Sequence, residues 1–418
     1  MSSIETENNE SYLDDEYEEV VLEEPEEGKK KRSIWRTLRL IFFCLCGITA
    51  IVALVLYFYA KNAIRDGGYA ETWIVDVHGD ILEDRSYGDN PQQTMDVYVP
   101  RTLDPAKSRG AILFIHGGAW IGGGRWEQES FAKMMAKEGY LTANMEYTLY
   151  NNDLKERKDE YNIELVLEDV RLALAKLVEI GEEYGYQIDR VALSGHSAGG
   201  HISMLYGFRS RTREDFASPV KIAFVAPRVG PFDFHAKTWN IPSSDEPATD
   251  RDGSEDALSN TWTVEKRIET MAKIASFLSG VEISKERYLN PDEKTEAALE
   301  SISPLYDVKP GVPPIFAAYG AKDIIVPSQN YKLLKHAFAG LKAKSVADVA
   351  PDDTETQVFD LLVFPNSNHM LARDPDYTLK WRGLFLSYAS RYLMTPVESS
   401  ATGGGDGAEN AAEAKAEK

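Results

Sequence analysis

The run from Val191 to Gly200 constrains the fold of this chain more than any other stretch. A short apolar segment, typical of a β-strand, ends in Gly195-His196-Ser197-Ala198-Gly199, and a segment typical of a helix follows from His201. A G-x-S-x-G pattern between a strand and a helix is typical of a tight turn that exposes the serine. Its glycines carry no Cβ, so strand and helix can pack closely. We predict that Ser197 is a nucleophile at a helix N-terminus, although the pattern alone also fits an ordinary glycine-rich turn.

Two later residues stand where a serine nucleophile needs partners. Asp323 follows the apolar run 314–319, and His369 follows the run 357–364. In an open α/β sheet, ligands bind beyond the carboxyl ends of the strands. Alone, Asp323 also fits a turn-forming residue and His369 a surface histidine beside a helix. In the order Ser197, Asp323, His369 they predict a catalytic triad in which His369 is the base and Asp323 orients it.

A second glycine-containing segment, His116-Gly117-Gly118-Ala119, follows the apolar run 111–115. Glycines allow backbone N–H groups to approach a substrate closely, and such groups stabilise a developing oxyanion. We predict that the N–H groups of Gly117, Gly118 and Ala198 form the oxyanion hole, with a plain Gly-Gly turn as the alternative. We expect His116 to support this loop through hydrogen bonds. No metal-ligand spacing is visible, so the sequence predicts neither a metal nor a cofactor.

Strand-like and helical patterns alternate over residues 67–395, which predicts an α/β domain with a mostly parallel central sheet flanked by helices. The opening strands look antiparallel to the rest. The expected strands are 72–77, 93–100, 111–115, 140–146, 188–193, 222–226, 314–319 and 357–364, and the expected helices are 126–138, 161–184, 201–208, 328–341 and 377–393.

Residues 233–301 interrupt this alternation. They are rich in polar and turn-forming residues up to 259, and helix-like stretches follow at 264–277 and 292–300. An insertion beyond the carboxyl edge of a sheet is typical of a cap, so we interpret it as a cap that shapes the substrate pocket. A solvated surface excursion is the alternative.

The two ends of the chain differ in composition from its middle. Residues 1–33 form an acidic stretch that ends in basic residues, and residues 396–418 are of low complexity, so we expect both to be disordered tails. The formal net charge is −21. This acidic balance argues against a nucleic acid as partner. The oligomeric state stays open.

Residues 34–60 include an uncharged, apolar run from Leu40 to Ala60, preceded by Lys29-Lys30-Lys31-Arg32. About 20 such residues suffice to span a bilayer as a helix. We predict a transmembrane helix over 34–60, and basic residues before it place the N-terminus in the cytosol and the catalytic domain outside. The expected protein is therefore a single-pass membrane protein. A cleaved signal peptide and a buried core helix are the alternatives.

Taken together, the motifs at 116–120, 195–201 and 323–327 and the histidine at 369 resemble the α/β-hydrolase superfamily. His-Gly-Gly and Ser-Ala-Gly-Gly resemble its hormone-sensitive-lipase-like and BD-FAE-type serine esterase branch, and 118–121 is similar to prenylcysteine methylesterases. The resemblance covers about 93–393. It implies an α/β-hydrolase fold and a small-molecule ester as substrate. The sequence departs from the family pattern in two places. Ala119 stands where a third glycine is common, and the loop between Asp323 and His369 is long.

The expected function is that of a membrane-anchored serine hydrolase that cleaves carboxylic esters through an acyl-enzyme. The same triad would also suit an amidase, a formamidase or an exopeptidase. A catalytically silent hydrolase-like interaction domain is a further alternative, because a fold does not by itself imply an activity.

Overall fold

The computed structural model describes residues 73–101, 110–151, 160–214, 216–240, 263–351, 353 and 355–394. All of them belong to one compact unit, Asn62–Lys418. The predicted N-terminal tail, the predicted transmembrane helix at 34–60 and the predicted tail at 396–418 lie outside the described residues. Within the described ranges, no helix is both long and apolar enough to cross a membrane.

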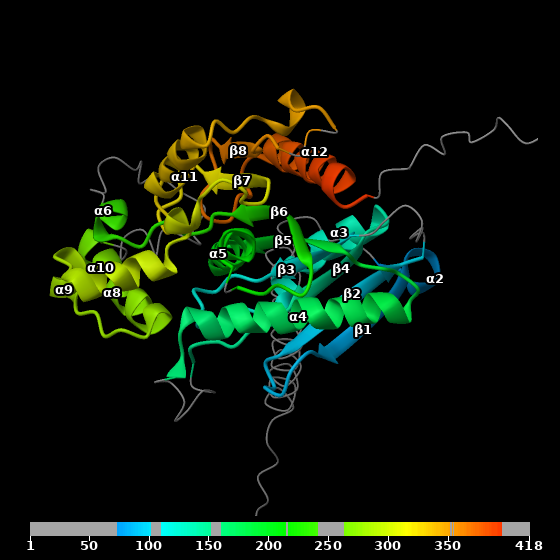
Figure 1. The fold of residues 1–418 in the computed structure, drawn as a ribbon, viewed down its shortest axis with the longest axis horizontal. Coiled ribbons are helices and arrows are strands. Elements are labelled where there is room, and N and C mark those ends of the chain that lie inside the picture. The colour runs from blue at the N-terminus through cyan, green and yellow to red at the C-terminus, as the bar shows by residue number, and fades with distance from the viewer. Residues whose placement is uncertain are drawn as a thin grey trace, which may run out of the picture. The chain divides into compact units, whose positions relative to one another are not determined.

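One eight-stranded sheet organises the described residues, in the order β1-β2-β4-β3-β5-β6-β7-β8 (Figure 1). β2 runs antiparallel to β1 and β4, and every other neighbouring pair is parallel. This confirms the mostly parallel sheet with antiparallel opening strands. The bounds are β1 Gly79–Ser86, β2 Thr94–Pro100, β3 Gly110–Ile115, β4 Leu141–Met145, β5 Arg190–His196, β6 Lys221–Arg228, β7 Ile315–Gly320 and β8 Phe359–Phe364.

Helices cover both faces of the sheet. Phe224 of β6 packs on Phe385 of α12 at a ring distance of 5.6 Å, whereas the next residue, Val225, faces Gly207 of α5. Because successive strand residues point to opposite faces, α5 and α12 lie on opposite sides. α3 contacts α12, and α4 and α11 contact α5. The bounds are α3 Glu129–Lys137, α4 Ile163–Glu183, α5 Ala198–Thr212, α11 Gln329–Gly340 and α12 Pro375–Tyr392.

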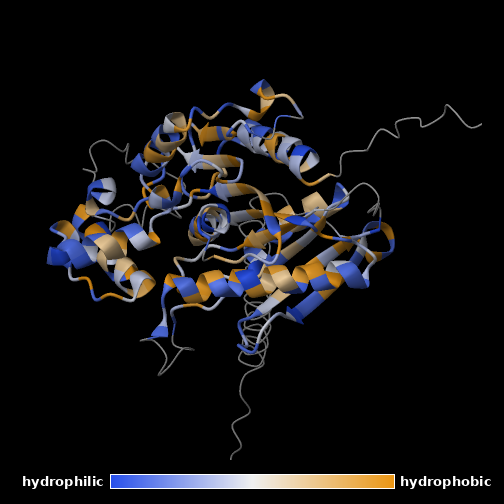
Figure 2. Cartoon of the chain, viewed as in Figure 1, coloured by the Kyte–Doolittle hydropathy of each residue, from blue (hydrophilic) through white to orange (hydrophobic). Residues whose placement is uncertain are grey.

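The hydropathy of each element follows this layering. Every residue of β3 is buried, as expected for a strand covered on both faces. α4 shows hydrophobic and hydrophilic colour in alternation along its length (Figure 2), and its buried residues include Val166, Val170 and Leu177. The helix therefore presents an apolar stripe to the sheet and a polar one to solvent.

The prediction of a strand over 72–77 is wrong. A single helical turn, α2 Val75–His78, precedes β1 instead. The backbone N–H of Ile74 donates to Nδ1 of His78 at 2.8 Å, and Gly79, with φ 127°, turns the chain into β1. Val75 and Val77 are exposed. Among the described residues, no strand pairs with this segment, and the local hydrogen bonds are those of a helical turn.

The insertion after β6 carries helices at the two stretches that the sequence predicts, 264–277 and 292–300, and two further short helices that the sequence does not predict. They are α6 Ala236–Trp239, α8 Val264–Ser279, α9 Lys285–Leu289 and α10 Glu293–Ile302, followed by the 3₁₀ turn η3 Pro304–Asp307. Residues 241–262 lie outside the described residues. The insertion is fixed to the helix that follows Ser197: His201 Nε2 donates to the carbonyl of Ile302 at 2.7 Å, and Arg209 pairs with Asp307 at 2.9 Å.

Candidate active site

Ser197 occupies the sharp turn between β5 and α5. Its φ of 54° and ψ of −117° are unfavourable for a residue with a Cβ. The turn is held because the N–H of Ser197 donates to the carbonyl of Arg228 in β6 at 2.9 Å. A Cβ on Gly195 would lie 2.3 Å from the Gly199 backbone, and one on Gly199 would lie 2.1 Å from the carbonyl oxygen of Ile115. Glycine is therefore required at both positions that the motif predicts.

The carboxylate of Asp323 bonds the ring of His369. Asp323 Oδ2 lies 2.8 Å from His369 Nδ1, and the Asp323 side chain is fully buried. The other oxygen, Oδ1, accepts the N–H groups of Ile325 and Val326, each at 2.9 Å. Asp323 thus forms a turn with one oxygen and orients the imidazole with the other, so the two roles considered for it occur together.

The loop that carries His369 is held by a residue that sequence reasoning misses. The buried carboxylate of Asp374 accepts the N–H of Asn366 at 3.0 Å and the hydroxyl of Ser367 at 2.7 Å. Burial raises the pKa of Asp374, but hydrogen bonds from Ser367 and Asn366 outweigh it and hold the pKa below its ordinary value. In the sequence, Asp374-Pro375 resembles only a helix start.

Ser197 and His369 line one cavity of about 400 Å³. Since Nδ1 of His369 is bonded to Asp323, Nε2 is the ring nitrogen left for a substrate or a hydroxyl. No hydrogen bond between the Ser197 hydroxyl and that ring occurs among the described contacts. The structure therefore brings all three predicted residues to one region and bonds two of them directly.

The loop after β3 needs a correction to the predicted oxyanion hole. The N–H of Gly117 donates to Oε2 of Glu127 at 3.1 Å, so it is not a free donor as the sequence predicts. Gly118 and Ala119 line the cavity, with φ values of 97° and 52°. The backbone N–H groups of both, and that of Ala198, have no partner among the described contacts. Ala119 therefore joins Gly118 and Ala198 as a candidate donor, and Gly117 does not.

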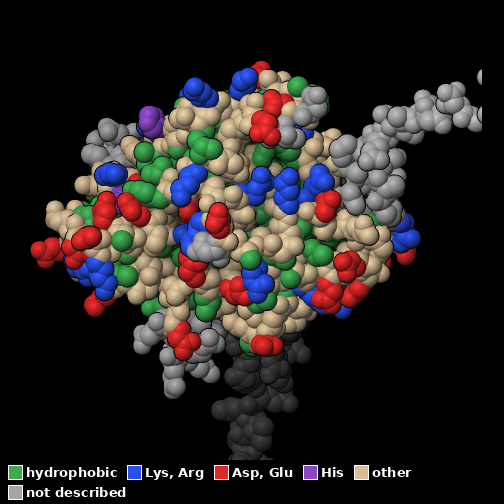
Figure 3. Space-filling view, viewed as in Figure 1, with side chains coloured by type: hydrophobic (Ala, Val, Ile, Leu, Met, Phe, Trp, Pro, Cys, Tyr) green, Lys and Arg blue, Asp and Glu red, His purple; other side chains and the backbone are tan. Residues whose placement is uncertain are grey.

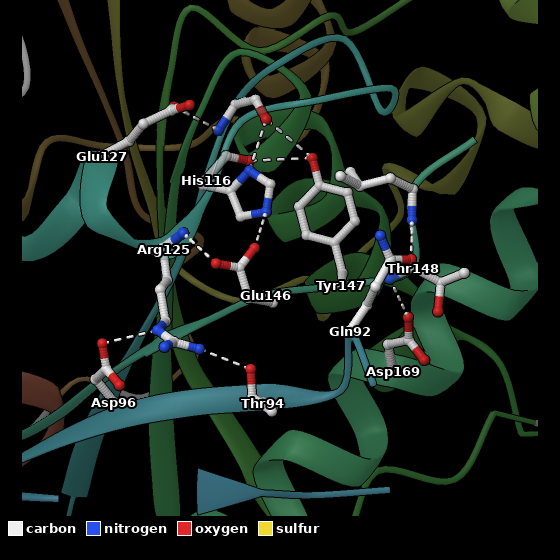
Figure 4. A network of polar contacts seen from close by, with 12 residues as sticks. Gln92, Thr94, Asp96, His116, Arg125, Glu127, Glu146, Tyr147, Thr148 and Asp169 are labelled. Atoms are coloured by element: carbon white, nitrogen blue, oxygen red, sulfur yellow. Dashed lines mark hydrogen bonds and ion pairs between the residues drawn. The ribbon is translucent and has the colours of Figure 1, made fainter. Parts of the chain in front are cut away.

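The ring of His116 ties this loop to the body of the sheet (Figure 4). Its Nδ1 lies 2.8 Å from the carbonyl of Gly117, and its Nε2 lies 3.2 Å from Oε2 of Glu146. The ring stacks on Tyr147 at 4.3 Å, whose hydroxyl donates to the Gly117 carbonyl at 3.1 Å. His116 is fully buried and is not among the residues that line the cavity.

Glu146 extends this network towards the antiparallel strands. Burial raises the pKa of Glu146, but contacts with His116 and Arg125 outweigh it and lower the pKa. The Arg125 side chain in turn bonds Asp96 at 2.8 Å and Thr94 at 2.6 Å. The opening strands thus help to position the loop beside Ser197, a role that the sequence pattern does not reveal.

The walls of the cavity are mainly apolar. They include Trp126, Phe131 and Trp381, together with Ile325, Phe364 and Leu371. None of the described residues that line the cavity belongs to 233–301, so the expected shaping role of the insertion stays a prediction. Trp120 is buried, is not among the residues that line the cavity, and packs edge to face with His201 at 5.2 Å.

A second histidine–carboxylate pair lies in the insertion. Asp233 Oδ1 lies 2.6 Å from His235 Nδ1, and Glu296 Oε1 lies 3.3 Å from the other ring nitrogen. Asp233 also holds the hydroxyl of Thr238. Neither Asp233 nor His235 lines the cavity, so this pair fixes the start of the insertion.

A family model matches most of the region that the site occupies. The model, described as BD-FAE, matches residues 95–338. That range is more than half of the chain, and it includes the Ser197 turn, the loop after β3 and Asp323, whereas His369 lies beyond it.

Two curated relatives and one solved structure are also similar to the chain. Esterase LipC of Mycobacterium tuberculosis (strain ATCC 25618 / H37Rv) is 24% identical over 250 residues, or 58% of this chain and 51% of LipC. The probable isoprenylcysteine alpha-carbonyl methylesterase ICME of Oryza sativa subsp. japonica is 28% identical over 123 residues, or 29% of this chain and 27% of ICME. The match thus spans about half of the first relative and about a quarter of the second.

The solved structure is that of esterase B from Lactobacillus rhamnosis (HN001). It superposes with a TM-score of 0.51 at 19% identity, covering 82% of this chain and 95% of that chain. Together with the strand order, this likeness shows that the described body has the α/β-hydrolase fold.

Proposed function

Because the chain belongs to the BD-FAE family, we propose that it is a serine hydrolase that cleaves carboxylic esters through an acyl-enzyme. The observation that carries the proposal is the contact of 2.8 Å between Asp323 and His369, in a cavity that Ser197 also lines. A nucleophile, a base and an orienting acid on three loops match the roles of a triad.

In the acylation step, Nε2 of His369 accepts the Ser197 hydroxyl proton as the serine oxygen attacks the ester carbonyl. The carboxylate of Asp323 keeps the Nδ1 proton on the far side of the ring and stabilises the imidazolium that forms. When the carbon–oxygen bond of the ester breaks, His369 gives its proton to the leaving alcohol. Water then repeats the sequence on the acyl-enzyme, releases the acid and restores Ser197.

The negative charge of the tetrahedral intermediate needs donors that are in place beforehand. We assign this role to the N–H groups of Gly118, Ala119 and Ala198, which have no partner among the described contacts. Ala198 begins α5, and the free N–H groups and the dipole at a helix N-terminus favour an anion. Loss of one such donor typically lowers kcat on the order of 10²-fold.

A direct test measures hydrolysis of short-chain p-nitrophenyl esters by the full-length chain in detergent. We expect turnover that Ser197→Ala abolishes, and covalent labelling by a fluorophosphonate probe that the same substitution prevents. A folded protein that neither turns over nor reacts would support the silent interaction domain. Faster cleavage of matched amides than of esters would support an amidase, formamidase or exopeptidase.

We also propose that residues 34–60 anchor the protein in a membrane, with the N-terminus cytosolic and the catalytic domain extracytoplasmic. The uncharged run 40–60 and the basic residues before it support this from the sequence alone. Protease treatment of intact cells should remove the catalytic domain and spare an N-terminal tag. Recovery of the protein in the supernatant after carbonate washing of membranes would contradict the anchor.

A further inference from the structure

Arg228 is a buried cation in the wall of the cavity that Ser197 and His369 line. It ends β6, directly beside His196 at the end of β5, and its side chain is 8% exposed. Burial lowers the pKa of Arg228, to about 9, which leaves the guanidinium protonated at neutral pH. A positive charge is therefore fixed within the same cavity as the nucleophile.

This guanidinium has fewer partners than its donors require. Its Nη2 donates to the side-chain oxygen of Gln128, and this is its only hydrogen bond among the described residues. Its Nε is buried without a partner, and no ion pair with a carboxylate occurs within the described ranges. An arginine carries five N–H donors, and burying a charge without an ionic partner is unfavourable. The cavity wall therefore holds a cation whose charge is unpaired among the described residues, and an anion would suit it.

The other charged wall residue does not supply that anion. Glu127 lines the cavity, but its Oε2 accepts the Gly117 N–H at 3.1 Å, and it acts on Arg228 only through longer-range attraction that raises the pKa. On the face of the molecule that Figure 3 shows, acidic and basic side chains are interspersed, whereas Arg228 is buried and has no ion pair among the described residues.

Aromatic rings hold the guanidinium in one place. Its central carbon lies 3.9 Å from the centre of the Phe131 ring and 5.4 Å from that of Trp381, and these two rings meet edge to face at 5.0 Å. Cation–π contacts of this kind fix the plane of an arginine and leave its edge for a planar anion. A guanidinium held in this way suits a carboxylate, which can accept two of its N–H groups.

We propose that Arg228 forms a carboxylate subsite, and that the preferred substrates are esters that carry a free carboxylate in addition to the ester bond. This inference rests on the proposed function, and it assigns a substrate class to the same site. The carboxylate could belong to the acid part or to the alcohol part of the ester, and two substrate pairs distinguish them. The first pair is monomethyl adipate and the methyl ester of adipic acid monoamide. The second is 4-acetoxybutanoate and 4-acetoxybutanamide.

The experiment measures kcat/KM by pH-stat for both pairs with the full-length chain. We expect the anionic member of one pair to be favoured by roughly tenfold or more, the usual size of a charge-assisted hydrogen bond. Arg228→Gln should bring that ratio close to one, and Arg228→Lys should retain part of it. The matched variant Arg382→Gln, which changes an exposed arginine of α12, should keep the full ratio.

Because each ratio compares two substrates on one protein, a general loss of activity in a variant cancels. If Arg228→Gln does not fold, the kcat/KM ratios of the wild-type protein and of Arg228→Lys test the subsite instead. Wild-type protein that cleaves the neutral members as fast as the anionic ones, in both pairs, would overturn the subsite and leave the esterase proposal standing. Absence of any ester hydrolysis, with no fluorophosphonate labelling of Ser197, would overturn the proposed function and the subsite with it.

Discussion

The imidazole Nε2 of His196 lies 3.0 Å from the carbonyl oxygen of His369, although 173 residues separate the two histidines. A carbonyl only accepts, so Nε2 of His196 carries the proton and donates. Burial, the proximity of His369 and the charge of Arg228 keep the pKa of His196 well below its ordinary value, so the ring is neutral. The residue before the nucleophile therefore holds the backbone of the proposed base.

Replacing His196 should consequently lower activity without removing any group that reacts. We expect His196→Ala to reduce kcat on the order of 10²-fold, because a displacement of about 1 Å in a catalytic group has that effect. His196→Gln retains an N–H donor near the same place and should recover part of the loss. An alanine variant with kcat within threefold of wild type would show that the His369 loop needs no such support.

Substitution of Asp323 should separate activity from stability. Asp323→Asn keeps an oxygen for the N–H groups of Ile325 and Val326, but its amide would face Nδ1 of His369 and favour the wrong tautomer. We expect kcat to fall about 10⁴-fold with little change in Tm. Asp323→Ala also removes the oxygen that accepts the turn N–H groups, so it should lower both kcat and Tm. A large drop in Tm for the asparagine variant would contradict this division of roles.

The close approach of α5 to β3 makes Gly199 intolerant of a side chain. In Gly199→Ala the new Cβ would lie 2.1 Å from the Ile115 carbonyl oxygen, so the elbow must shift and we expect loss of both stability and labelling of Ser197. Gly383→Ala is the matched control. Gly383 lies inside α12 with no atom within 4 Å of a Cβ, and the change should stabilise by about 0.5–1 kcal/mol. Equal changes in Tm for Gly199→Ala and Gly383→Ala would disprove the steric argument.

The low pKa of Asp374 predicts a pH-dependent stability. Its pKa in the folded protein lies below the unfolded value of about 3.9 because Ser367 and Asn366 donate to it. The carboxylate therefore stabilises the fold above that value, and the contribution is lost as pH falls through the folded pKa. Asp374→Asn should lower Tm at neutral pH, and the difference from wild type should shrink as pH falls from about 5 to about 3. Asp80→Asn, which changes an exposed aspartate, should show no such convergence.

Much of the fold follows from local signals in the sequence. Apolar runs such as 111–115 and 191–193 become buried strands because their composition suits a strand covered on both faces. The two glycines of the Ser197 turn mark a close approach that the structure contains. Where the sequence misleads, as at 72–77, the alternation is present, but no strand among the described residues pairs with this segment.

The site is less predictable, because its support comes from contacts between distant segments. The N–H of Gly117 is occupied because the side chain of Glu127 accepts it, and nothing in the local pattern shows this contact. Asp374 resembles an ordinary helix start. Arg228 could have been found, since it ends an apolar strand at the carboxyl edge where ligands bind.

The proposed triad is divided between the middle of the sheet and its margin. Ser197 follows β5, which has β3 and β6 as neighbours. The loop of His369 follows β8, the last strand of the described sheet, which pairs with β7 along one edge and, among the described residues, has only an isolated bridge to Lys344 on the other. Local unfolding of β8 would displace His369, whereas Ser197 would keep its position in the middle of the sheet. Activity should therefore be lost at a lower denaturant concentration than global unfolding. Amide hydrogens of β8 should exchange faster than those of β5. Between the two transitions the protein would be folded but inactive.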